Sequence, residues 1–131
     1  GDPALIAQIL EVRKHAGMMV PLPVQKAMIA ALSDSDHVAE QRARYNARKD
    51  ALIPALVAAG FTIDFSDAGL YLWATRDEDC WQSVAWLASL GILATPGIFY
   101  GDATHIRIAM TATDQQISEA AMRITREVSA Q

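Results

Sequence analysis

Residues 94–101 read Ala-Thr-Pro-Gly-Ile-Phe-Tyr-Gly, and residues 105–110 read His-Ile-Arg-Ile-Ala-Met. The Pro-Gly pair is a turn signal, and apolar residues with the composition of strands lie on both sides of it. The second segment is apolar except for His105 and Arg107. These two stretches predict a pair of strands around a tight connection, with a guanidinium placed in one of the strands.

The side-chain period of a strand decides where that guanidinium points. Successive side chains point to opposite faces, so Ile106 and Ile108 facing a core would place Arg107 on the other face. His105 and Ala109 would then lie beside the arginine. An arginine in this position needs an anionic partner, and its planar fork of donors suits a carboxylate.

The rest of the chain alternates between helical and strand patterns. Apolar residues at helical spacing, with caps and glycine stops, predict helices over about residues 3–15, 24–32, 37–59, 81–90 and 117–128. Shorter apolar segments predict strands over residues 61–65, 70–74, 92–95 and 105–111. This order of elements implies an α/β fold of the α+β kind, in which helices pack on a small mixed sheet.

Three of these elements carry more detailed expectations. The continuous apolar run of residues 70–74 is typical of a strand covered on both faces. The long helix carries charged residues that are most simply its solvated face, with a binding patch as the alternative; they are Glu40, Arg42, Arg44, Arg48, Lys49 and Asp50. In the helix that Asp77 or Asp79 can cap, we expect one buried stripe made of Trp81, Val84, Ala85 and Ala88.

Residues 1–33 differ from the rest in how much apolar surface they offer. Apolar side chains surround the second helix on nearly every side, which favours burial against more than one neighbour. A chain of 131 residues has difficulty providing both walls. We therefore interpret residues 1–33 as interdomain hinge helices of a missing large domain, and residues 34–131 as a small C-terminal domain.

The composition excludes several classes of protein. With 11 basic and 15 acidic residues and a net charge of −4, the chain has no basic patch, so we expect no nucleic-acid partner. No apolar run approaches the roughly 18 residues that span a bilayer, and no secretory leader is present, so we expect a cytoplasmic protein without a membrane partner. The single cysteine, Cys80, is expected to be a small packed side chain.

Three blocks of sequence carry a resemblance to a known family. They are Ala68-Gly69-Leu70-Tyr71-Leu72-Trp73, Pro96-Gly97-x-Phe99-Tyr100-Gly101 and His105-Ile106-Arg107-Ile108-Ala109. Their order and spacing resemble the C-terminal part of class I and II aminotransferases, the pyridoxal-phosphate enzymes of fold type I. The resemblance covers nearly the whole chain. Within the family, the chain is most similar to the actinobacterial succinyldiaminopimelate aminotransferases of lysine biosynthesis.

The resemblance implies roles for five residues. It implies that Arg107 binds the α-carboxylate of the substrate, and that the region of Gly69 borders the substrate pocket. Phe99 and Tyr100 would line the wall of that pocket, and Gly97 would let backbone approach the ligand. From local sequence alone, both glycines are equally well explained as turn residues.

The resemblance also implies the activity of the full-length protein. It would be a homodimeric pyridoxal 5'-phosphate enzyme that transfers an amino group between an amino acid and a 2-oxo acid. Similarity to the lysine-biosynthesis enzymes points to N-succinyldiaminopimelate and glutamate as the substrates.

The residues that perform this chemistry are not evident in the chain. Lys14, Lys26 and Lys49 do not resemble the lysine that forms the Schiff base, which in the family lies shortly upstream of Gly1. No phosphate-binding loop is present either. We therefore expect no catalytic or cofactor-binding residue here, and an inactive fragment when the chain is alone.

The three histidines have no predicted role in chemistry, and other functions of the same fold remain as alternatives. His15, His37 and His105 have no spacing that suits a metal, so we expect no metal site and no catalytic histidine. The same fold also occurs in pyridoxal-phosphate lyases and decarboxylases, and in aminotransferase-like domains of transcription regulators. A module that binds an amino acid without chemistry is a further alternative.

Overall fold

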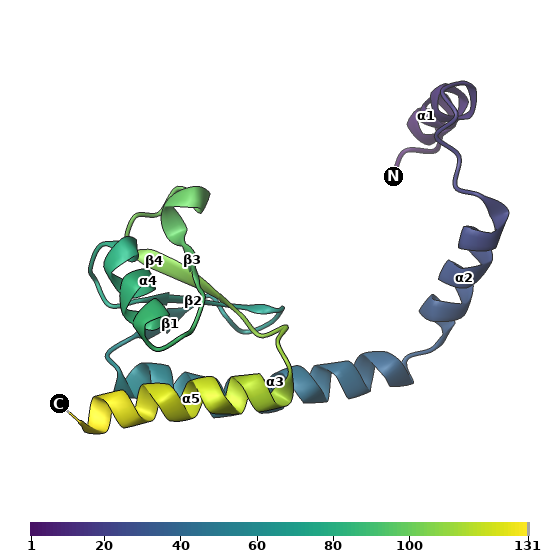
Figure 1. Ribbon diagram of the computed structural model, residues 1–131. Helices are drawn as coiled ribbons and strands as arrows, with labels where there is room; N and C mark the ends of the chain where they lie inside the picture. Colours follow the sequence, from purple (N-terminus) through teal and green to yellow (C-terminus); the bar gives the residue numbers. More distant parts are fainter. Residues whose placement is uncertain (131) are drawn as a thin grey trace. The chain divides into compact units, whose positions relative to one another are not determined.

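The computed structural model describes residues 1–130 (Figure 1). The backbone forms two compact units, residues 1–39 and the residues from Glu40 onward. The boundary falls in the first turn of α3 (Asp36–Ala58). We describe each unit by itself.

The first unit contains the helices α1 (Pro3–His15) and α2 (Leu22–Ser33), both of which were predicted. Asp2 caps α1, because its Oδ1 accepts a hydrogen bond from the backbone N–H of Ala4 at 2.8 Å. Neither helix has a buried residue in the structure. The exposed large apolar side chains of the two helices are Leu5, Ile6, Ile9, Leu10, Val12, Leu22, Val24, Met28, Ile29 and Leu32.

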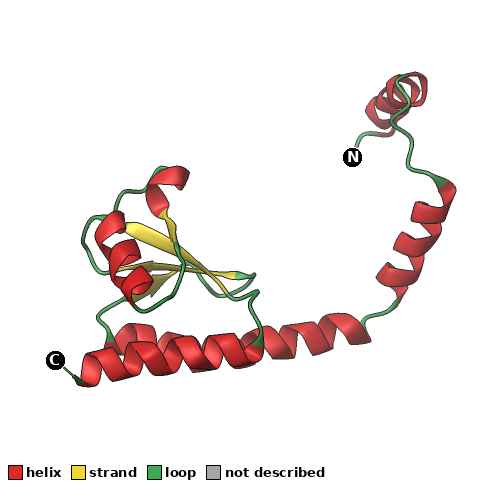
Figure 2. Ribbon diagram, in the orientation of Figure 1, coloured by secondary structure: helices red, strands yellow, loops and turns green. Residues whose placement is uncertain are grey.

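The second unit is built on a four-stranded antiparallel sheet (Figure 2). Its strands are β1 (Thr62–Asp64), β2 (Tyr71–Thr75), β3 (Thr95–Pro96) and β4 (His105–Ala109), in the spatial order β1-β2-β4-β3. The predicted fold class, helices packed on a small sheet, is confirmed, but the expectation that this sheet is mixed is wrong. The strand pairing is antiparallel throughout.

Three helices pack on one face of this sheet and form the core with it. They are α3, α4 (Cys80–Ser89) and α5 (Asp114–Ser129), and α3 and α5 lie side by side (Figure 1). The sheet contributes four side chains that are at most 4% exposed, Leu72, Ala74, Ile106 and Ile108. The predicted alternation of β4 is confirmed, because Ile106 and Ile108 are buried while Arg107 lies on the other face.

The expectation that residues 70–74 are covered on both faces is wrong. Leu72 and Ala74 enter the core, but Tyr71 is 42% exposed and Trp73 is only half-buried. In the unit from Glu40 onward, the helices cover one face of the sheet. The apolar composition of Tyr71 and Trp73 therefore serves a different purpose from core packing.

The predicted strand over residues 61–65 is shorter than expected. β1 ends at Asp64, and Phe65 has a φ of 47°, in the left-handed region. This backbone conformation turns the chain out of the sheet, so the Phe65 side chain is 95% exposed.

The predicted buried stripe of α4 is also wrong. Trp81 is 52% exposed, and the side of the helix that enters the core carries Cys80, Ser83 and Leu87. The prediction for Cys80 as a packed side chain is confirmed. α4 is apolar on several sides, so its sequence did not single out the face that packs.

The Pro-Gly connection forms a short 3-10 helix, η1 (Gly97–Tyr100), directly after β3. Gly97 is buried, and a Cβ built on it would lie 2.3 Å from the carbonyl oxygen of His105 and 2.6 Å from that of Asp102. Only a residue without a side chain fits this position. Gly97 therefore brings the start of η1 against the backbone that leads into β4.

Candidate functional site

The Arg107 guanidinium lies among aromatic rings on the face of the sheet away from the core. Its central carbon is 4.3 Å from the ring centroid of Tyr71 and 5.2 Å from that of Tyr100. One terminal nitrogen, Nη2, is 3.4 Å from the hydroxyl of Thr95 on the neighbouring strand. The two rings hold the planar cation in place by cation–π contacts without satisfying its hydrogen-bond donors.

Arg107 has an unsatisfied donor. Its Nε is buried and has no hydrogen-bond partner, and within residues 1–130 it forms no ion pair with a carboxylate. A buried donor without an acceptor costs about 1–3 kcal/mol. Such an orphaned donor on a guanidinium is explained when an anion outside this part of the chain accepts from it.

A pocket of about 390 Å³ opens beside this arginine. Among the predicted site residues, Gly69, Tyr100 and Arg107 line it, together with the loop and strand residues Phe65, Ser66, Ala68, Leu70, Tyr71, Leu72 and Trp73. Gly69 has a φ of 86°, which favours glycine, and an added Cβ there would meet open space. The structure thus brings Gly69, Tyr100 and Arg107 together.

The two other predicted residues lie outside the lining of this pocket. Phe99 is 68% exposed and packs edge-on against Trp81 of α4, with ring centroids 6.0 Å apart. Gly97 is buried under the backbone of Asp102 and His105. Their location next to Tyr100 in η1 connects them to the pocket through the backbone.

A second polar cluster lies on the same face, around His105. Its Nε2 is 3.1 Å from Asp64 Oδ2, and its Nδ1 is 2.8 Å from Asp102 Oδ2. Burial lowers the pKa of His105, but hydrogen bonds and charges from the two carboxylates outweigh it and hold this pKa above its usual value. The imidazole ring also stacks on Trp73, with centroids 5.3 Å apart and planes 7° apart.

Comparisons with known proteins identify the fold that carries these residues. The family model for aminotransferase class I and II matches residues 1–124. The chain belongs to this family. A probable aminotransferase of Mycobacterium tuberculosis is 59% identical over 127 residues, which cover 95% of this chain and 30% of that protein. The 4-dedimethylamino-4-oxo-anhydrotetracycline transaminase OxyQ of Streptomyces rimosus is 58% identical, covering 95% of this chain and 35% of its own.

A solved structure of an aminotransferase from Neisseria meningitidis superposes with a TM-score of 0.86 at 29% identity, over 98% of this chain and 35% of that one. An LL-diaminopimelate aminotransferase of Oleidesulfovibrio alaskensis is also a relative, at 35% identity over 95% of this chain and 34% of its own. The chain therefore spans about a third of the length of the curated relatives it matches.

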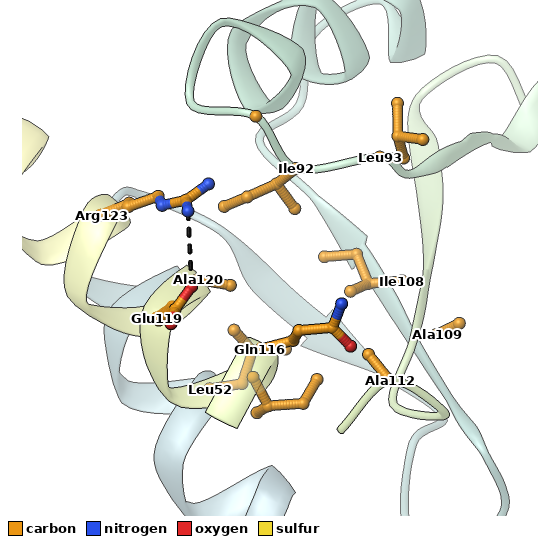
Figure 3. Close-up of a pocket in the computed structure, with 12 residues that line it drawn as sticks. Leu52, Ile92, Leu93, Ile108, Ala109, Ala112, Gln116, Glu119, Ala120 and Arg123 are labelled. Atoms are coloured by element: carbon orange, nitrogen blue, oxygen red, sulfur yellow. Dashed lines mark hydrogen bonds and ion pairs between the residues drawn. The ribbon is translucent and has the colours of Figure 1, made fainter. Parts of the chain in front are cut away.

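This class I and II aminotransferase chain has a further pocket, of about 430 Å³, on the core side of β4 (Figure 3). Ile108 of β4 and Ile92 of the loop after α4 line it, and Gln116, Glu119 and Arg123 line it from α5. Arg123 is engaged with Glu119 and with the carbonyl of Leu90. This pocket contains none of the five predicted site residues.

Two kinds of feature are absent from residues 1–130, the part of the aminotransferase chain that the structure describes. Within residues 1–130, no three His, Cys, Asp or Glu side chains gather in a way that could hold a metal ion. None of the helices there is both long and apolar enough to cross a membrane.

Sequence reasoning missed the cluster around His105 and its neighbours. The sequence predicts for His105 only a place beside Arg107, and for Tyr71 and Trp73 only a place in a strand covered on both faces. The spacing Asp102-x-x-His105 was a readable local signal for one half of the cluster. Asp64 had no such signal, because it is 41 positions away from His105.

Proposed function

We propose that this chain is the C-terminal part of a pyridoxal-phosphate aminotransferase, in which Arg107 binds the α-carboxylate of the substrate. The single observation that supports the role of Arg107 is its buried Nε, which has no acceptor within residues 1–130. A bidentate carboxylate would accept hydrogen bonds from Nε and one terminal nitrogen together, in the geometry that a guanidinium provides.

The chemistry of amino transfer suits one such arginine. The donor is an amino acid and the acceptor a 2-oxo acid, and both carry a carboxylate next to the reacting carbon. A single fixed guanidinium can therefore orient the substrate in both directions of the reaction. Tyr71 and Tyr100 hold the guanidinium in its plane, and Gly69 and Tyr100 line the adjoining space.

The residues of this chain do not fit the cofactor itself. Pyridoxal phosphate needs a lysine amine for its aldehyde, and Lys14 and Lys26 are exposed on α1 and α2. Lys49 is engaged, since its Nζ donates to the carbonyl of Ser66 at 2.6 Å, so the expectation that it belongs to a solvated face is wrong. On this proposal, the lysine and the phosphate site belong to the portion of the relatives' length that the chain does not span. The full-length protein is also proposed to pair with a second subunit.

For the substrates, we propose N-succinyldiaminopimelate and glutamate, each of which gives its amino group to the 2-oxo acid derived from the other. The resemblance to the lysine-biosynthesis enzymes supports this choice, as does the relative named as an LL-diaminopimelate aminotransferase. The relative named as an anhydrotetracycline transaminase suggests the alternative substrate class, an oxo-anhydrotetracycline. Kinetics of the full-length protein with glutamate and either the 2-oxo acid derived from N-succinyldiaminopimelate or 4-dedimethylamino-4-oxo-anhydrotetracycline as amino acceptor separate the two classes.

For residues 1–33, we propose the role of hinge helices that pack on the remainder of the full-length protein. The support is that every residue of α1 and α2 is exposed, including ten large apolar side chains. Apolar burial contributes roughly 25 cal/mol per Å², so these side chains favour an apolar partner. Hydrogen exchange should show both helices strongly protected in the full-length protein, and equal protection in the isolated chain would contradict this role.

The test of the carboxylate site is steady-state kinetics on the full-length enzyme. Leaving a bound carboxylate unpaired costs roughly 2–5 kcal/mol, so Arg107→Ala should lower kcat/KM for amino acids by about thirtyfold to several thousandfold. Arg107→Lys should recover only part of this loss, because a point charge lacks the planar fork. Arg44→Ala is the matched control, since Arg44 pairs with Glu40 on the surface of α3.

Absorbance of the bound cofactor should be unchanged in both Arg107 variants, since no residue of this chain contacts the cofactor aldehyde on this proposal. A kcat/KM for Arg107→Ala within threefold of the wild type would make Arg107 a structural residue. Loss of the cofactor absorbance together with activity would equally contradict a role confined to the substrate.

A further inference from the structure

His105 faces a carboxylate with each of its two ring nitrogens. Nε2 lies 3.1 Å from Asp64, and Nδ1 lies 2.8 Å from Asp102. A neutral imidazole carries one N–H and one lone pair, so it can donate to only one of these oxygens. The hydroxyl of Thr104 also lies 3.1 Å from Nδ1. Only the protonated ring, which has two donors, bonds both carboxylates at once.

The two carboxylates are held very differently. Asp102 Oδ1 accepts hydrogen bonds from the backbone N–H and the hydroxyl of Thr104, at 2.8 and 2.9 Å, and from the backbone N–H of His105. These bonds lower the pKa of Asp102 to about 2, the contribution of the Thr104 N–H being the largest. The side chain of Asp64 is 38% exposed, and its contact is with His105.

A continuous series of ring contacts leads from this cluster to Arg107. His105 stacks on Trp73, Trp73 meets Tyr100 edge-on with centroids 5.9 Å apart, and Tyr100 lies beside the guanidinium. The cross-strand register supports this arrangement, because Trp73 is the β2 partner of Arg107 and Asp64 is the β1 partner of Trp73.

We infer that the imidazolium of His105 is a positioning residue for the carboxylate site, holding Trp73 and Tyr100 in the arrangement that presents Arg107 to the substrate. This inference rests on the proposed role of Arg107. His105 makes no contact with the substrate in this role. It acts by clamping β1, β4 and the Asp102 segment together behind the aromatic rings.

Deprotonation of His105 would weaken the site in two ways. One carboxylate would face a lone pair, and Asp64, the less anchored of the two, would be released toward water. The face of the sheet would also lose one positive charge two residues away from Arg107, which makes the surroundings of a bound anion more negative. Both effects reduce affinity for a carboxylate as the pH rises through the His105 titration.

Within residues 1–130, the charged groups that contact His105 are two carboxylates. β1 contributes Asp64, the segment before β4 contributes Asp102, and β2 contributes the uncharged side chain of Trp73. The ammonium of Lys49, from α3, donates to the carbonyl of Ser66. Arg107 is a cation on the same strand, two residues from His105.

The test is binding of glutarate, a dicarboxylate that cannot undergo amino transfer, to the full-length enzyme by calorimetry over a range of pH. Wild-type Kd should rise about tenfold as His105 loses its proton, a size typical of coupling between contacting residues. His105→Gln should bind glutarate about tenfold more weakly at low pH and show no such pH dependence. His37→Gln is the matched control, because His37 pairs with a single exposed carboxylate, Asp34.

A second variant separates clamping from simple folding damage. In Asp64→Asn, the side-chain amide can donate to the lone pair on Nε2 of a neutral His105. This variant should therefore keep tight glutarate binding at high pH. In kinetics, the His105 change should raise KM with little effect on kcat, as expected when binding alone is weakened.

The outcomes distinguish this inference from the proposed function. Wild-type affinity and pH profile in His105→Gln, or an unchanged pH profile in Asp64→Asn, would overturn the role of His105 alone. Undiminished glutarate binding in Arg107→Ala would overturn the proposed carboxylate site, and the role of His105 with it.

Discussion

Arg48 of α3 reaches Asp114 of α5, with its Nε 2.6 Å from Asp114 Oδ1. Its Nη1 also donates to the carbonyl of Met110 at 2.8 Å, just after β4. The Arg48 side chain is only 11% exposed, so the prediction that it belongs to a solvated face is wrong. One guanidinium therefore ties together the two long helices and the end of the strand that carries Arg107.

Arg48→Met should lower the free energy of unfolding by about 1–3 kcal/mol, because the buried carbonyl of Met110 loses its donor. Asp114 is 70% exposed and can turn to water, so the ion pair itself adds little. Urea unfolding of the chain measures the change. Arg44→Met, which removes an exposed pair with Glu40, is the control and should cost less than about 1 kcal/mol. Equal effects of the two substitutions would contradict the bridging role of Arg48.

Glu78 should make stability depend on pH. Burial raises its pKa, but hydrogen bonds from Ser83 and Arg76 and the charge of Arg76 outweigh it and lower this pKa below 4.5. A carboxyl with a lowered folded-state pKa stabilises the fold above its unfolded pKa, and this stabilisation is lost as the pH falls through the folded pKa. Glu78→Gln should cost about 1 kcal/mol at neutral pH and almost nothing in acid. The measurement is thermal unfolding across the acidic range. If this coupling were absent, the difference in stability between the wild type and Glu78→Gln would be the same at every pH.

Gly97 and Gly101 should respond to alanine for different reasons. At Gly97, the new Cβ would press on the carbonyl oxygens of His105 and Asp102, so Gly97→Ala should cost roughly 1–3 kcal/mol or more and displace η1. At Gly101, the surrounding space is open and only the φ of 87° is unfavourable, so about 1 kcal/mol is expected. Thermal unfolding of Gly97→Ala and Gly101→Ala measures the loss of stability in each variant. A milder effect at Gly97 than at Gly101 would argue against the close backbone approach.

The isolated chain should form no stable adduct with pyridoxal phosphate. Lys14 and Lys26 are exposed on helices, and Lys49 is bonded to Ser66, so no lysine has a pocket for the cofactor. Borohydride trapping followed by mass spectrometry is the measurement. Low, scattered labelling of all three lysines is expected, whereas a stoichiometric adduct on one of them would contradict the proposed division of the active site.

Several elements of the fold could be predicted because their signals are local. The caps and glycine stops of the helices are such signals, and in the structure Asp2, Asp79 and Thr113 each cap the helix that follows them, through side-chain bonds to backbone N–H groups two or three residues ahead. The alternation of residues 105–109 likewise placed Arg107 away from the core, as the structure confirms. Such signals involve only neighbouring residues, so they can be read from the sequence without knowledge of the fold.

The face that an element buries was predicted less well. Trp81 of α4 and Tyr71 and Trp73 of β2 are large and apolar, yet none is buried in the core. The free energy of burial depends on apolar area removed from water, and several faces of these elements offer similar area. The choice among them is made by what packs opposite, which is a property of the whole sheet.

The sequence by itself determined the helices, the strands β2 and β4 and the side of β4 on which Arg107 lies, because hydrogen bonding and side-chain period act between near neighbours. Only the tertiary structure decided what surrounds that arginine. Tyr71 and Tyr100 reach it from a neighbouring strand and from η1, and Asp64 reaches His105 across 41 positions. Antiparallel pairing of β1, β2 and β4 brings these residues onto one face, and a register shifted by one residue would turn each strand's set to the opposite face.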